Sequence, residues 1–151
     1  MSIQTSAAFF ACCLESPRPT LGPTLVHMPA LNWPLGSTLR VRFMDDSDPT
    51  LAAVIEKIFT IAQTWTRYAN IQFERVKAGR SDLRIRLDNS NLYNSTVGTD
   101  ASSVSQSKHT MVLGGRDRFK EDVRLNRRID YLRRVTLHEF GHALGLKHEH
   151  Q

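Results

Sequence analysis

The sequence contains little cysteine: its 151 residues include only Cys12 and Cys13, which are neighbours. Two adjacent cysteines cannot build the disulfide framework that stabilises small secreted domains. Neither has a second Cys or a His at the spacing of a metal site, so we expect both to be free thiols. Cysteine usage therefore argues against a disulfide-stabilised fold and leaves the redox compartment open.

Long hydrophobic runs are absent as well. No apolar stretch approaches the roughly 18 residues of a membrane span, which argues against an integral membrane protein. The segment 7–14 (AAFFACCL) is similar to the short core of a signal peptide. However, no Lys or Arg precedes it and no small-x-small cleavage site follows it. The sequence thus leaves the localisation undetermined.

A strong excess of one charge is also lacking, since the formal net charge is only +5. No recognised nucleic-acid motif accompanies this charge, so we expect no nucleic-acid partner. The most basic stretch, residues 116–134, has four acidic residues interleaved with its arginines: Asp117, Glu121, Asp122 and Asp130. This mixture favours a solvated face with ion pairs. A basic protein that binds polyanions remains the weaker alternative, and the oligomeric state is left open.

The composition is that of a soluble globular domain, with 40% hydrophobic and 23% charged residues. Residues 1–36 are punctuated by five prolines and two glycines, which predicts an irregular leader: Pro17, Pro19, Pro23, Pro29, Pro34, Gly22 and Gly36. We therefore expect a Pro-rich leader over 1–36 and one folded domain over 37–151.

Within 37–151, three stretches alternate apolar and polar residues with the period of a half-buried strand: 39–43, 71–76 and 83–87. The short stretch 109–113, closed by two glycines, is a fourth candidate strand. Helical spacing predicts one helix from Asp48 to Tyr68, begun by an Asp-Pro pair, and a second from about Asp122 to Leu144 with a break near Asn126. The polar stretch 88–107 predicts a long surface loop. The order predicts an α+β fold, with a mixed twisted sheet of four to five strands and two helices on one side.

Four of the six histidines lie in the last fourteen residues: His138, His142, His148 and His150. On a helix, His138 and His142 are separated by about 40° of rotation and about 6 Å of rise, so both can bind one ion. Glu139 is rotated by about 100° from His138, which keeps its carboxylate out of the ligand set but close to a bound water. The pair would be presented by a helix whose far side is apolar.

Gly145 follows three residues after His142, and a glycine there is typical of a helix end, because it tolerates the left-handed backbone of a C-terminal turn. The chain can then return and bring His148 to the ion as a third ligand. Three imidazoles and one open position are the arrangement of catalytic zinc, and Glu139 can take the proton of a zinc-activated water. The spacing HExxHxxGxxH predicts metal-assisted hydrolysis rather than a helix with unrelated histidines.

The last fourteen residues, HEFGHALGLKHEHQ, resemble the long zinc motif of the metzincin endopeptidases, and the trailing HEHQ is closest to the astacin-like group. Residues 97–100 (VGTD) and 110–114 (TMVLG) resemble the segment before the active-site helix. The resemblance implies a metzincin-like N-terminal subdomain with this helix at its C-terminal end. It implies one Zn²⁺ per chain held by His138, His142 and His148, with Glu139 as general base. It also implies secretion, and cleavage of internal bonds in a polypeptide lying antiparallel to the strand near Met111.

The chain departs from that family in its length. Family members continue past the zinc motif into a C-terminal half with a methionine-containing turn, whereas this sequence ends at Gln151. Residues 37–151 are therefore expected to be a partial catalytic domain. A catalytically inactive zinc-binding fragment is the alternative. The roles of Glu149 and His150 stay open, His150 being either an outer group or a substitute ligand.

Overall fold

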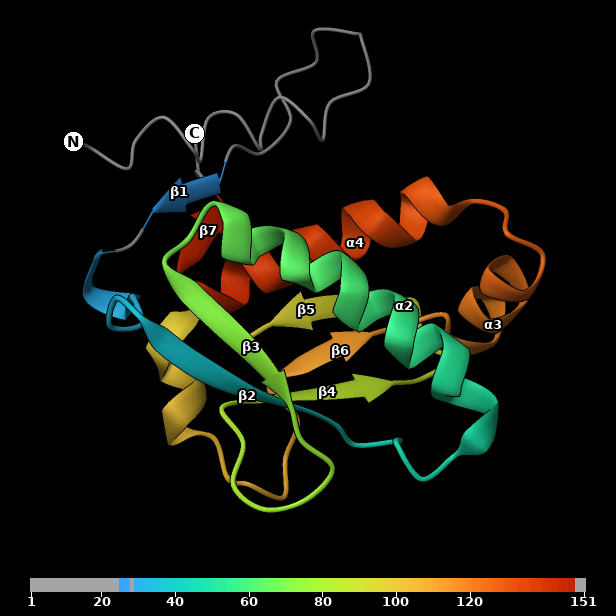
Figure 1. The fold of residues 1–151 in the computed structure, drawn as a ribbon, viewed down its shortest axis with the longest axis horizontal. Helices are drawn as coiled ribbons and strands as arrows, with labels where there is room; N and C mark the ends of the chain where they lie inside the picture. The colour runs from blue at the N-terminus through green and yellow to red at the C-terminus, as the bar shows by residue number, and fades with distance from the viewer. Residues whose placement is uncertain (1–24, 28, 149–151) are drawn as a thin grey trace, which may run out of the picture.

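The structure is a computed structural model, and it describes residues 25–27 and 29–148. Most of the predicted leader lies outside these residues, as do four residues discussed above: Cys12, Cys13, Glu149 and His150. The described residues form one sheet layer with helices packed against it, and the strand pair β1–β7 lies apart from that sheet (Figure 1). The predictions for the leader and for the domain boundary at residue 37 remain predictions.

The main sheet has five strands in the order β3-β2-β4-β6-β5. They are β2 (Ser37–Phe43), β3 (Ile71–Arg75), β4 (Leu83–Leu87), β5 (Tyr93–Ser95) and β6 (Met111–Leu113). The pairs β2–β3, β2–β4 and β4–β6 are parallel, and β5 runs antiparallel to β6. The predicted α+β class with a mixed sheet is thereby confirmed, and all four predicted strands are present with shifts of one or two residues at their ends.

The first predicted helix is continuous in the structure. The turn η2 (Pro49–Leu51), the helix α2 (Ala52–Ala62) and the turn η3 (Gln63–Arg67) follow one another without a gap. Asp48 caps the start, because its carboxylate accepts from the backbone N–H of Thr50 at 2.9 Å.

The second predicted helix is wrong in its beginning. The structure has two helices there, α3 (Arg116–Arg124) and α4 (Ile129–Ala143), so the described residues contain three α-helices rather than the two expected. The predicted break near Asn126 is present, and both Asn126 and Arg128 have positive φ. Asp122, only 1% exposed, accepts from Arg128 at 2.8 Å across this break. Such an ion pair fixes the direction in which α4 begins.

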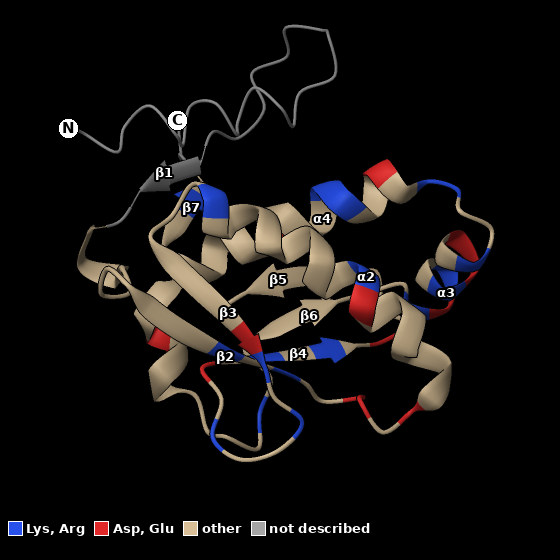
Figure 2. Cartoon of the chain, viewed as in Figure 1, with Lys and Arg blue, Asp and Glu red and all other residues tan. Residues whose placement is uncertain are grey.

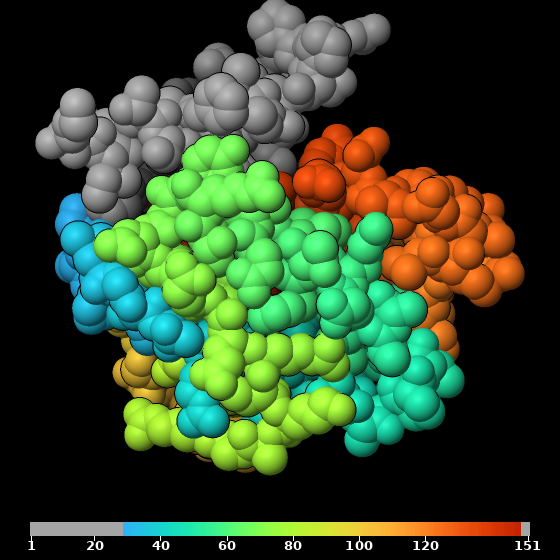
Figure 3. Space-filling model, in the orientation of Figure 1, coloured from blue at the N-terminus to red at the C-terminus, as the bar shows by residue number. Residues whose placement is uncertain are grey.

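The helices α2 and α4 pack together against the same face of the sheet. Alternate residues of four strands share one buried cluster with both helices: Leu39, Val41, Phe43, Ile71, Phe73, Leu83, Ile85, Leu87, Met111, Leu113, Val54, Ile55, Ile58, Leu132, Leu137 and Phe140. The indole of Trp65 donates to the carbonyl of Leu137, which joins η3 to α4. From the side shown in Figure 3, α2 and the residues after it cover most of the second half of α4.

The opposite face of the sheet is covered by the chain after β5. This segment contains the turn η4 (Gly98–Ser103), and it is held by Arg84, which is fully buried on β4. The guanidinium donates to four backbone carbonyls at 2.6 to 3.2 Å: Ser81, Ala101, Val104 and Lys108. The alternation of apolar and polar residues along this strand would place Arg84 on a solvent-exposed face. In the structure its guanidinium instead donates the hydrogen bonds that water would otherwise give to these carbonyls.

The expected surface loop over 88–107 is therefore wrong in two places, at β5 and at η4. Two further short strands were not predicted, β1 (Leu25–His27) and β7 (Leu146–His148), which pair antiparallel. None of the described helices has the length and apolar composition needed to cross a membrane. Basic and acidic residues alternate over α3 and the start of α4 (Figure 2), with ion pairs such as Arg124–Glu121 at 2.7 Å.

Candidate metal centre

The helix α4 presents two histidines on one face and buries the other face. Leu137 and Phe140 are 6% and 0% exposed, and the ring of Phe140 meets that of Phe73 edge to face at 5.3 Å. His138 and His142, one turn apart, therefore cannot rotate away from their shared face without disrupting the core. Their ring centroids lie 4.7 Å apart. The helix thus supplies a fixed pair of imidazoles, as the sequence predicts.

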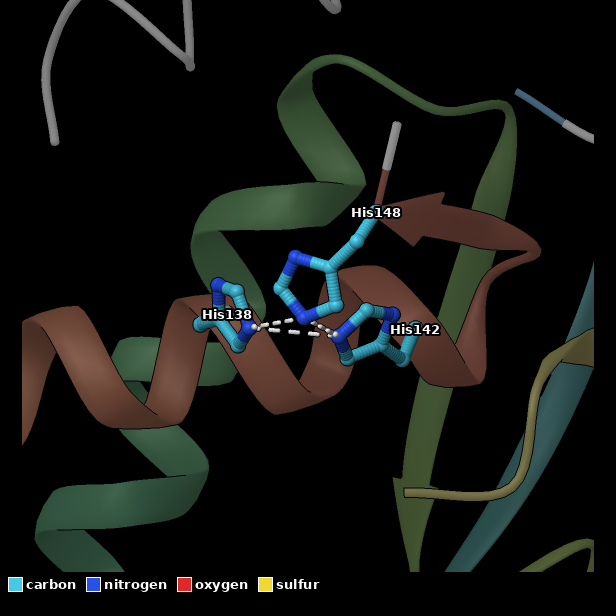
Figure 4. Close-up of side chains that lie close together, drawn as sticks. All are labelled: His138, His142 and His148. Atoms are coloured by element: carbon cyan, nitrogen blue, oxygen red, sulfur yellow. Dashed lines mark hydrogen bonds between the residues drawn. The ribbon is translucent and has the colours of Figure 1, made fainter. Parts of the chain in front are cut away.

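The chain reverses after α4 through Gly145, whose φ of 106° is in the region that favours glycine. This confirms the predicted helix end and leads directly into β7. His148 at the end of β7 points back toward the helix, so that the three imidazoles face one another (Figure 4). Their Nε2 atoms form a triangle with sides of 3.2, 3.2 and 3.1 Å. The structure therefore brings together all three histidines that the sequence nominates as ligands.

This triangle fits a tetrahedral metal ion. Two nitrogens that bind one zinc at about 2.0–2.1 Å with tetrahedral angles lie about 3.3–3.4 Å apart, close to the separations observed. His142 donates through Nδ1 to the carbonyl of Leu146 at 2.6 Å, so in the neutral ring its Nε2 carries a lone pair and cannot donate. The three Nε2 atoms cannot all be satisfied by hydrogen bonds to one another. A metal cation at the centre of the triangle would accept a lone pair from each of them.

Burial keeps two of these imidazoles, those of His138 and His142, in the form that binds metals. It lowers the pKa of His138 to about 4, with a further contribution from the charges of His142 and His148. Burial also lowers the pKa of His142, against the opposing effect of its hydrogen bond to Leu146. Both rings are therefore neutral at neutral pH, and a neutral imidazole is the ligand form of histidine.

Glu139 lies beside this cluster in a buried position, 3% exposed. Its Oε2 has no hydrogen-bond partner among the described residues, and burial raises its pKa to about 7. A buried carboxylate without a counter-ion is costly for the fold and is typical of a group that exchanges protons near neutral pH. The role of Glu139 as general base remains a prediction.

Comparison with known families decides which kind of protein carries this arrangement. Residues 33–151, most of the chain, match the peptidase family described as matrixin. The chain belongs to the matrixin family. This family implies zinc and, more broadly, a protease. The expected metzincin-type affiliation is supported at this level, whereas the astacin-like subgroup is not specifically indicated by the match.

Solved structures are similar to this chain in their fold. A crystal structure of myroilysin matches with 33% identity and a TM-score of 0.68, over 82% of this chain and 49% of that chain. A second myroilysin structure matches with 29% identity and a TM-score of 0.66, over 79% and 52% of the two chains. The chain thus spans about half the length of the myroilysin chains. The metzincin-like α+β fold expected from the sequence is confirmed.

Two further comparisons do not help to classify the chain. The zinc-protease HCE-1, a hatching enzyme of the medaka fish Oryzias latipes, matches with 13% identity and a TM-score of 0.43, over 82% of this chain and 53% of its own. A score this low supports no conclusion. A search of curated proteins gave no match.

One expectation about the substrate strand is wrong. The sequence places the polypeptide against the strand near Met111, but that strand, β6, is paired on both sides, with β4 and with β5. No further chain can pair with it. Among the described residues the sheet has two edge strands, β3 and β5, and the one next to β6 is β5. β5 is three residues long, and the sequence predicts a loop there, because Tyr-Asn-Ser carries no hydrophobic alternation. A strand this short is defined by its partner and not by its own propensity.

Proposed function

We propose that this chain is part of a zinc-dependent endopeptidase, with His138, His142 and His148 as the zinc ligands and Glu139 as the general base. The observation that carries the proposal is the triangle of three Nε2 atoms within 3.2 Å of one another. The matrixin match, the neutral state of His138 and the burial of Glu139 support it. Membership of the astacin-like subgroup, suggested by the trailing HEHQ, belongs to the same proposal.

When bound, zinc supplies a Lewis acid that polarises a peptide carbonyl and acidifies a water molecule. The protein supplies the remaining functions. Glu139, with an unpartnered Oε2 and a pKa of about 7, accepts the proton of the attacking water and returns it to the amine that leaves. The bond between His142 and the Leu146 carbonyl holds the ring in one tautomer, so that Nε2 keeps its lone pair.

For the substrate, we propose a polypeptide that adds a strand to β5. In the described part of the chain β5 pairs with β6 alone, through Tyr93↔Leu113 to Ser95↔Met111, so its other side is an edge. Edge strands bind extended peptides through backbone hydrogen bonds, which supply affinity, while neighbouring pockets for the side chains supply specificity. β5 also lies against α4, the helix that carries His138 and His142, so a bound peptide would pass near these histidines.

The test has a metal arm and a catalytic arm. We expect about one zinc per chain in the purified protein by elemental analysis, lost in His142→Ala and retained in His109→Ala, which removes a half-buried histidine outside the cluster. We expect Glu139→Gln to retain zinc and to lose hydrolysis of an unfolded protein substrate. Glu74→Gln, which removes an exposed carboxylate from β3, should leave both unchanged.

Each outcome separates the candidates. Absence of zinc in the unmodified protein would refute the metal site. Zinc at full occupancy without chelator-sensitive hydrolysis would favour the alternative, a zinc-binding fragment without activity. Hydrolysis that continues at the same rate in Glu139→Gln would exclude this residue as the base.

A further inference from the structure

We propose that the segment formed by residues 25–27 and 29–33, with Trp33 as its main contact, positions the third histidine relative to α4. We call it the N-terminal segment. This inference rests on the proposed metal site, because it concerns how His148 is held beside His138 and His142. The helix itself fixes only two of the three histidines. The third lies beyond a glycine turn, and the stretch 143–148 that carries it is contacted along its length by the N-terminal segment.

The first contact closes the end of α4. The last carbonyls of a helix lack intrahelical partners and need others. Leu144 N–H donates to Phe140 and Gly141, and Gly145 N–H donates to His142. None of these bonds reaches the carbonyl of Ala143, the last residue of α4, so it needs a donor from elsewhere. The indole N–H of Trp33 donates to it at 2.8 Å across 110 positions of sequence. A side chain from the opposite end of the chain therefore satisfies the helix end next to His142.

The second contact surrounds the turn at Gly145. A Cβ at this position would lie 2.9 Å from Asn32 Oδ1 and 3.3 Å from the carbonyl oxygen of Leu31. The backbone of the N-terminal segment thus lies directly against the residue at which the chain turns from His142 toward His148. The same carbonyl oxygen of Leu31 also lies against Gly98 of η4, where a Cβ would be only 1.9 Å from it. The backbone of Leu31 is therefore in close contact with both the Gly145 turn and η4, so a shift of one of them would require a shift of Leu31.

The third contact holds the histidine strand itself. β1 pairs antiparallel with β7 in the register Leu25↔His148, Val26↔Lys147 and His27↔Leu146. In the described residues β7 belongs to no other sheet, so its strand geometry depends on β1 (Figure 1). The pairing extends to His148, which is the last residue of β7. An isolated three-residue strand has no stability without a partner.

Through these three contacts, the N-terminal segment determines where His148 lies relative to α4. Loosening it would let the third imidazole depart from the other two, while α4 and the core keep His138 and His142 in place. Metal affinity depends steeply on such supporting contacts, because a ligand must be held to a fraction of an ångström. Trp33 is therefore a positioning residue and not a ligand.

The chain offers a matched control, because it has only two tryptophans and both donate to carbonyls of α4. Trp33 donates to Ala143 beside the metal site, and Trp65 donates to Leu137 on the core side at 3.1 Å. Phenylalanine keeps an aromatic ring at either position and removes the indole N–H. We would measure zinc affinity of the full chain by competition with a chromophoric chelator. The visible spectrum of the Co²⁺ form would be recorded beside it, since it reports coordination geometry.

We expect Trp33→Phe to weaken zinc binding about tenfold, in the lower range for loss of an outer contact, and to change the Co²⁺ bands. Trp65→Phe should leave the affinity within about twofold and the bands unchanged. Equal affinities for Trp33→Phe and the unmodified protein would overturn the inference, and so would equal losses in both variants. If Trp33→Phe fails to fold, Gly98→Ala provides the second test. It displaces Leu31 without altering Trp33, and an unchanged zinc affinity there would likewise overturn the inference.

Failure of the inference is distinguishable from failure of the proposed function. If the unmodified protein binds no zinc, the metal site is refuted and the inference falls with it. If it binds zinc and Trp33→Phe binds equally well, the site stands and only the role of the N-terminal segment is refuted.

Discussion

Replacing Glu139 by glutamine should stabilise the metal-free protein at alkaline pH, independently of its effect on the proposed peptidase activity. Glu139 is 3% exposed, its Oε2 has no partner among the described residues, and burial raises its pKa from 4.5 to about 7. Glutamine keeps the shape of the protonated carboxyl group but cannot ionise. The variant therefore imitates the protonated side chain at every pH.

The sign and size follow from the two pKa values. Between about pH 4.5 and 7, the folded protein keeps a proton on Glu139 that the unfolded chain has released, so the free energy of unfolding falls as pH rises. The difference of about 2.5 units, at 1.36 kcal/mol per unit, corresponds to about 3 kcal/mol lost by pH 8. The lowered pKa of His138 acts with the opposite sign between about pH 4 and 6.5. This contribution of His138 is the same in the unmodified protein and in Glu139→Gln, so it cancels when their free energies of unfolding are subtracted.

The assay is urea unfolding of the metal-free proteins at about pH 5 and about pH 8. At pH 5 we expect Glu139→Gln and the unmodified protein to have similar stability. At pH 8 we expect the variant to be more stable by up to about 3 kcal/mol. Glu74→Gln, at an exposed position of β3, should show no such dependence. A stability difference between Glu139→Gln and the unmodified protein that is the same at both pH values would refute the assignment of a raised pKa to Glu139.

Three further changes test how the fold supports the site. Arg84→Met leaves buried carbonyls without a donor, so we expect the free energy of unfolding in urea to fall by about 3 kcal/mol or more. A fall below about 1 kcal/mol would show that Arg84 does not stabilise the segment after β5. Asp122→Ala removes the buried acceptor of Arg128, whose own side chain is 55% exposed, so we expect a loss of only about 1 to 2 kcal/mol in urea unfolding. Zinc should be retained, because Arg128 precedes His138 by more than two helical turns of α4, and a loss of zinc would contradict this. Gly114→Ala places a Cβ 2.4 Å from the carbonyl oxygen of Ser90, just before β5. We expect a higher KM for peptides with unchanged zinc content, and an unchanged KM would argue against β5 as the substrate edge.

The sequence predicted most of the sheet and the first helix because their signals are local. Alternation marks β2, β3 and β4 by their buried faces, and an Asp-Pro pair marks the start of the helical stretch at Pro49. The start of α3 was not predicted, because Arg116–Arg124 is highly charged and only Phe119 and Asp122 are buried on it. β5 and β7 are too short to carry a period, so they exist only because β6 and β1 pair with them.

By itself, the sequence determined the candidates for the chemistry: which residues are candidate ligands, which carboxylate follows the first of them, and that a glycine ends the helix between the second and third histidine. These follow from spacing along one helix and one turn, where distance in sequence fixes distance in space. Only the tertiary structure decided what holds the site. Burial by the core sets the pKa of Glu139, and residues more than a hundred positions away, Trp33 and β1, enclose the strand of His148. Such contacts have no local pattern, because they depend on where separate elements meet after folding.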